Sequence, residues 1–193
     1  MKNILLLTVF SLAMMGVAHA EKADSEKEAV ITARSGHVDD VKQVRTLTGD
    51  VVLVKGTLTM KAGRALITED PQGYQFITFW ADPGKLATFR QKRDGAGDLW
   101  VEGEAERVEY DNKTEVVKLF SKAKLTRLEG TKVTDVANGA FISYDSRQEV
   151  FKMENSDSGT STSDGGSVRM VIQPKTKAPQ AEKAPATPAP GKK

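Results

Sequence analysis

Four glutamates lie close together in the middle of the chain: Glu102, Glu104, Glu106 and Glu109. Paired carboxylates are the groups that cleave glycosidic bonds, so this cluster is a candidate for catalysis. Residues 102, 104 and 106 alternate along a segment with strand pattern, which places their side chains on one face. Because segments rich in Lys and Arg would lie beside them, we favour a solvated charged face and keep a glycan-active enzyme as the alternative.

Few other residues could perform chemistry. The chain contains no cysteine, which excludes a thiol nucleophile and a Cys/His metal cluster. Beyond the first 20 residues the histidine is His37, beside Asp39-Asp40, and we interpret it as a solvated side chain at a turn or strand start. Neither Asp39-Asp40 nor Asp111-Asn112 has the spacing of a calcium loop, and both are typical of turns. We therefore expect a protein that is not an enzyme, with no metal and no cofactor.

The N-terminus has the pattern of a secretory signal peptide. Lys2 precedes an apolar run at 4–17, and Ala18-His19-Ala20 is a small-x-small cleavage signal. The run is shorter than the ~20 residues that a membrane span requires. We expect cleavage after Ala20, with an uncleaved anchor as the alternative, and an exported chain without cysteine favours a bacterial periplasm.

Composition divides the remaining chain into three parts. Residues 21–28 are rich in charge and alanine and are predicted to be a mobile leader. Residues 29–174 are predicted to form one β domain, and the Ala/Pro/Lys-rich residues 175–193 a disordered tail. With Lys+Arg at 28 and Asp+Glu at 26, positive charge is not concentrated as nucleic-acid binding would require, so we expect no nucleic-acid partner.

The strand pattern is clearest at 105–128, where apolar and charged residues alternate between breaks at Asp111-Asn112 and Ser121-Lys122. It predicts three short strands there, and residues 57–62 and 64–69 are likewise predicted as separate strands. The pattern of 108–119 recurs 34 positions later, and a looser copy lies about 70 positions earlier, at 47–55. Repeated units that cannot bury their apolar faces alone predict an all-β domain of stacked antiparallel strands.

Alternation places one row of apolar side chains on a shared interior, with Val52 in the opposite phase. That interior is either an ordinary core or a slot that is open at its ends and accessible to an apolar ligand. Three cations, Lys85, Arg90 and Lys92, are interpreted as part of a solvated face. The candidate interior residues are Ile31, Val51, Leu53, Leu58, Met60, Phe89, Val108, Tyr110, Leu119, Leu125, Ile142 and Tyr144.

Four segments together resemble the LptA/OstA family, and the resemblance covers about residues 29–174. They are LTGDVVLVKGTLTMKA at 47–62, ATFRQ at 87–91, VEGEAERVEY at 101–110 and GGSVRMVIQP at 165–174. The chain departs from the family pattern at Leu86, where proline is common, and at Ser121, where glycine is common.

The resemblance implies a slightly twisted, V-shaped β-jellyroll, open at both ends, whose hydrophobic groove holds the acyl chains of lipid A. Its groove-facing positions carry over as Ile31, Phe89 and Tyr110. Within the resemblance, the alternative to a solvated face for Lys85, Arg90 and Lys92 is contact with lipid phosphates near a rim. The resemblance also implies periplasmic transport of lipopolysaccharide and head-to-tail self-association into a bridge between inner-membrane and outer-membrane components of the transport machinery. The alternatives are the membrane-tethered component of the same bridge and a periplasmic structural β-protein that binds no lipid.

Overall fold

The structure, a computed structural model, describes residue 24 and residues 26–174. The predicted signal peptide, most of the predicted leader and the predicted tail lie outside these residues. The described part consists of strands and turns, and it contains no helix long and apolar enough to cross a membrane. The strands are β1 (Ala29–Thr32), β2 (Ser35–Asp39), β3 (Val44–Lys55), β4 (Leu58–Glu69), β5 (Gln75–Trp80), β6 (Ala87–Lys92), β7 (Leu99–Ala105), β8 (Arg107–Asp111), β9 (Val116–Glu129), β10 (Lys132–Asp145), β11 (Val150–Glu154) and β12 (Arg169–Ile172).

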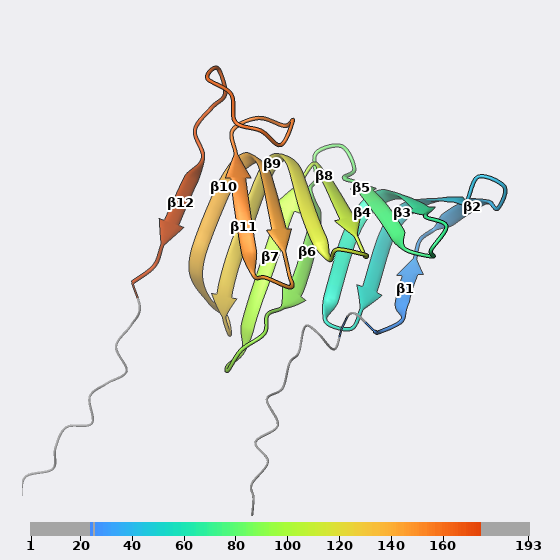
Figure 1. The fold of residues 1–193 in the computed structure, drawn as a ribbon, viewed down its shortest axis with the longest axis horizontal. Coiled ribbons are helices and arrows are strands. Elements are labelled where there is room, and N and C mark those ends of the chain that lie inside the picture. The colour runs from blue at the N-terminus through green and yellow to red at the C-terminus, as the bar shows by residue number, and fades with distance from the viewer. Residues whose placement is uncertain (1–23, 25, 175–193) are drawn as a thin grey trace, which may run out of the picture.

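All twelve strands belong to one antiparallel sheet, in which four long strands change partners midway. The first part of β9 pairs with β8 and its second part with β7, and β3, β4 and β10 change partners in the same way. The sheet therefore folds into two walls, with β1, β6, β7 and β12 in the first wall and β2, β5, β8 and β11 in the second. The fold is an all-β, jellyroll-like one, and β1 and β12 lie at opposite ends of it (Figure 1).

Two of the long strands bend where the backbone turns left-handed. The φ angles are 83° at Gly49 and 46° at Asp50 in β3, and 61° at Ser121 and 56° at Lys122 in β9. The two pairs are 72 positions apart, which matches the looser sequence repeat.

The turn predicted at Ser121-Lys122 is therefore wrong, since β9 continues through it and only passes from one wall to the other. The break predicted at Gly63 is wrong for the same reason, because β4 is continuous from Leu58 to Glu69. At Gly63 the chain approaches another segment closely, and a Cβ would lie 1.9 Å from an oxygen of Asp82. Bends of this kind let one strand contribute to both walls without losing its pairing on either side.

The shorter repeat is also visible in the backbone. The turns after β8 and β10 end at Glu115 and Glu149, which are 34 positions apart and have φ angles of 58° and 54°. The carboxylate of each accepts from an arginine, Glu115 from Arg147 and Glu149 from Arg93. The repeat predicted from sequence thus corresponds to two hairpins of the same geometry.

Candidate functional site

The apolar residues predicted to share an interior do so. Eleven of the twelve are at most 5% exposed and belong to one apolar cluster between the walls, and Ile31 is half-buried against that cluster. The opposite-phase Val54 is 42% exposed, which confirms the assignment of faces in β3. The same cluster contains residues that the sequence reasoning did not single out, namely Ile67, Ile77, Phe79, Val101 and Val117.

The centre of this interior is filled by the protein's own side chains. Phe89 from β6 in the first wall stacks on Tyr144 from β10 in the second, with ring centroids 6.3 Å apart. The ring of Phe89 also covers Gly103, where a Cβ would lie only 2.1 Å from the ring. Burial, followed by the charge of Glu115, raises the pKa of Tyr110, so its phenol stays neutral at physiological pH. An apolar ligand that entered here would have to part these contacts.

Within the part of the chain that the structure describes, the interior face is left uncovered toward both ends. In β12, Met170 lies opposite the buried Ala137, so its side chain belongs to the interior face, yet it is 42% exposed. Its neighbours on that face are Val168 and Ile172, and Ile172 is 69% exposed. At the other end, Val38 of β2 is 54% exposed. The apolar face therefore continues from the packed centre to uncovered edge strands.

The free rims of the two walls meet at a polar cluster that the sequence reasoning missed. Arg93 follows β6 in the first wall, and its Nη2 lies 2.5 Å from Oε2 of Glu149, at the start of β11 in the second wall. Arg127 of β9 donates to the backbone carbonyl of Glu149 at 2.8 Å and lies over the ring of Phe151. The sequence did carry a signal for Arg93. It shares the alternation phase of Phe89 and Gln91, which places its side chain on the interior face.

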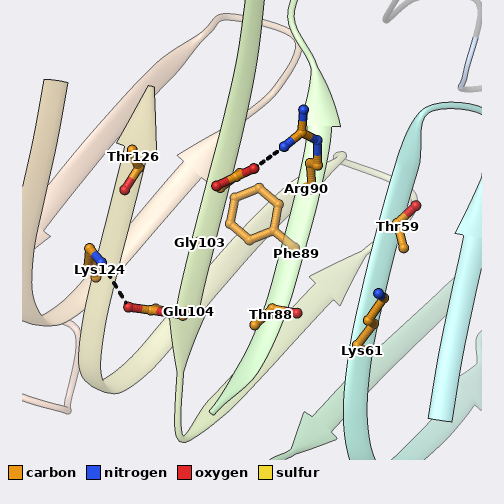
Figure 2. A pocket seen from close by; sticks show the side chains of 10 residues that line it. Thr59, Lys61, Thr88, Phe89, Arg90, Gly103, Glu104, Lys124 and Thr126 are labelled. Atoms are coloured by element: carbon orange, nitrogen blue, oxygen red, sulfur yellow. Dashed lines mark hydrogen bonds and ion pairs between the residues drawn. The ribbon is translucent and has the colours of Figure 1, made fainter. Parts of the chain in front are cut away.

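One hollow lies on the charged face of the first wall. It has a volume of about 440 Å³ and is lined by residues of β4, β6, β7 and β9. Arg90 pairs with Glu102, and Lys124 pairs with Glu104 at 3.1 Å. Figure 2 shows Lys124 and Glu104 side by side. Together with the pair of Lys122 and Glu106, these contacts confirm the solvated charged face that alternation predicted for the glutamates.

Two of the three predicted rim cations also form ion pairs with aspartates at the protein surface. Lys85 pairs with Asp82 and Lys92 with Asp98, and His37 is exposed in β2. The uncovered apolar interior is therefore the stronger candidate for a binding site.

Comparisons with known proteins show which family the chain resembles. The family model described as "LptA/(LptD N-terminal domain) LPS transport protein" matches residues 30–150. The lipopolysaccharide export system protein LptA of Haemophilus influenzae is 29% identical over 150 residues, covering 78% of this chain and 83% of that protein. The protein of the same name from Escherichia coli K12 is 30% identical over 134 residues, covering 67% and 71%.

A solved structure has the same fold. The crystal structure of LptH of Pseudomonas aeruginosa, named as the LptA-homologous periplasmic component of a lipopolysaccharide transport device, superimposes with a TM-score of 0.66 at 23% identity. The match covers 78% of this chain and 99% of that one.

Proposed function

Because the chain belongs to the family of LptA and the LptD N-terminal domain, we propose that it is a periplasmic carrier of lipopolysaccharide, which holds the acyl chains of lipid A between its two walls. The proposed groove consists of the twelve interior residues predicted from sequence. The single observation that carries the proposal is an apolar interior whose face continues, uncovered, onto the edge strands β2 and β12.

The energetics suit a carrier. Burying about a dozen methylenes recovers on the order of 10 kcal/mol at ~0.8 kcal/mol per CH₂, so free lipid would cross water very slowly. In this interior the ligand must first displace contacts such as Phe89 on Tyr144, which offsets part of that gain. Moderate net affinity is what a carrier requires, because a lipid held too tightly would not be passed on.

The edge strands support head-to-tail assembly as part of the same proposal. Among the described strands, β1 pairs only with β3, and β12 only with β10, so each has one side available to a strand of another copy. Joining these edges would cover the apolar side chains of Val168, Met170 and Ile172 and continue the interior from one copy to the next. The proposed partners are thus lipopolysaccharide, further copies of this chain, and the membrane components of the transport machinery. Catalysis has no part in this role.

Photo-crosslinking tests which face meets the lipid. A photoreactive amino acid at Phe89, which is 2% exposed, should capture lipid A, and one at the adjacent exposed Thr88 should not. Ile31 and the opposite-phase Val52 form a second pair with the same expectation. Equal capture within both pairs would refute the proposed groove.

A further inference from the structure

The contact between Arg93 and Glu149 joins the free rims of the two walls. The side chains are 16% and 27% exposed, which makes the pair far less accessible than Arg90 with Glu102, at 45% and 38%. Arg90 and Glu102 lie on neighbouring strands of one wall, whereas Arg93 and Glu149 come from opposite walls. Separating the walls would therefore break the contact of Arg93 with Glu149 and leave that of Arg90 with Glu102 intact.

Some donor and acceptor atoms of this cluster have no hydrogen-bond partner among the described residues. Among the described residues, Nε of Arg93, Nε of Arg127 and Oε1 of Glu149 are buried without a hydrogen-bond partner. Burial and the neighbouring charge of Arg93 lower the pKa of Arg127, although Asp135, Tyr144 and Glu149 oppose that shift. Two planar guanidinium groups with spare donors match the acceptor oxygens of a phosphate better than a single carboxylate does.

The position of the cluster suits the headgroup of an amphiphile. Phe151, beneath Arg127, packs against the apolar interior, so the arginines mark the boundary between that interior and water. A lipid whose acyl chains lie between the walls would place its first polar groups at this boundary.

We propose that Arg93 and Arg127 bind the phosphomonoester of an acylated lipid. Without lipid, the carboxylate of Glu149 occupies this phosphate site and joins the two rims, and the phosphate displaces it on binding. The inference rests on the proposed carrier function and adds the headgroup chemistry and the release of the rims.

Binding measurements on the full chain test the site with three probes: bisphosphorylated lipid A, lipid A stripped of phosphate, and inorganic phosphate. The wild type should prefer the bisphosphorylated lipid by about tenfold or more, the scale of a lost charge-assisted hydrogen bond. Arg93→Gln and Arg127→Gln should abolish the preference. Glu149→Gln should strengthen binding, because it removes the competitor, and the control Glu102→Gln should change nothing.

The decisive result is that Arg93→Gln should lower the affinity for bisphosphorylated lipid A and Glu149→Gln should raise it. If Arg93→Gln and Glu149→Gln shift the affinity in the same direction, the cluster is only a structural tie and the site is refuted. Equal binding of both lipids by the wild type overturns this inference alone, whereas binding of neither overturns the carrier function with it. Competition by inorganic phosphate as strong as that by lipid A would make this a free-anion site and overturn the lipid assignment. Should Arg93→Gln fail to fold, Arg93→Lys, which keeps the charge but loses the planar fork, takes its place.

A distance measurement tests the release of the rims. The chain has no cysteine, so spin labels at Ala96→Cys and Gln148→Cys, both exposed and on opposite rims, report the separation alone. Bisphosphorylated lipid A should lengthen that distance, and an unchanged distance in the lipid-bound protein would overturn the proposed displacement.

Discussion

Gly103 lies directly under the ring of Phe89, and replacing it with alanine tests the packing between the walls. The new Cβ would lie 2.1 Å from Cε1 and 2.6 Å from Cδ1 of Phe89, and 3.0 Å from a methyl carbon of Leu119. Carbon atoms normally approach to about 3.5–4.0 Å, so the ring must move by roughly 1.5 Å. That movement would disturb its stacking on Tyr144.

The expected cost follows from two opposing effects. Overpacking a filled core costs about 1–3 kcal/mol, whereas removing a glycine from a strand gains about 0.5–1 kcal/mol. Gly103→Ala should therefore lower the free energy of unfolding by roughly 1–2 kcal/mol, which corresponds to a loss in Tm of about 2–8 °C at ~2–4 °C per kcal/mol. Urea unfolding followed by tryptophan fluorescence measures the change.

The matched control is Gly166→Ala, because a Cβ at Gly166 meets nothing within 4 Å. Phe89→Leu should recover part of the loss in the Gly103→Ala background, and a double-mutant cycle measures that coupling. Stability that is unchanged or raised in Gly103→Ala, or a coupling energy of zero, would refute the packing argument.

Three further predictions concern the bends and the edges. Gly49→Ala should lower the free energy of unfolding by about 1 kcal/mol or more in denaturant titration, because its φ of 83° disfavours a side chain. Ser121→Gly, at the equivalent bend, should raise the free energy of unfolding by up to about 1 kcal/mol, less whatever the hydrogen bond from the serine hydroxyl to Asp157 contributes. A loss larger than that of one exposed hydrogen bond would contradict the equivalence. Ile172→Asp should weaken self-association in sedimentation velocity without lowering Tm, whereas Gln173→Asp, in the opposite phase, should not; equal effects would argue against assembly through the interior face of β12.

The sequence predicted the interior well, because each strand alternates and a single register error would have exposed an entire row. It also predicted the charged face of Glu102, Glu104 and Glu106. It failed at Ser121, since a Ser-Lys pair in a polar setting is typical of a turn, and only the left-handed backbone distinguishes a bend within one strand. The pair of Arg93 and Glu149 could not be predicted, because the phase of Arg93 does not specify a partner and the contact joins segments 56 positions apart that only the closing of the walls brings together.

The bends at Gly49 and Ser121 determine how the length of the molecule could change. A long hairpin has two strands, and each strand bends at its middle, so the hairpin contributes two half-strands to each wall. Neighbouring strands are spaced by about 4.8 Å. Duplicating one hairpin would lengthen the molecule by roughly 10 Å while leaving both terminal edges unaltered. The span of such a protein can thus grow in fixed increments during evolution, by gene-internal duplication and without redesign of its ends.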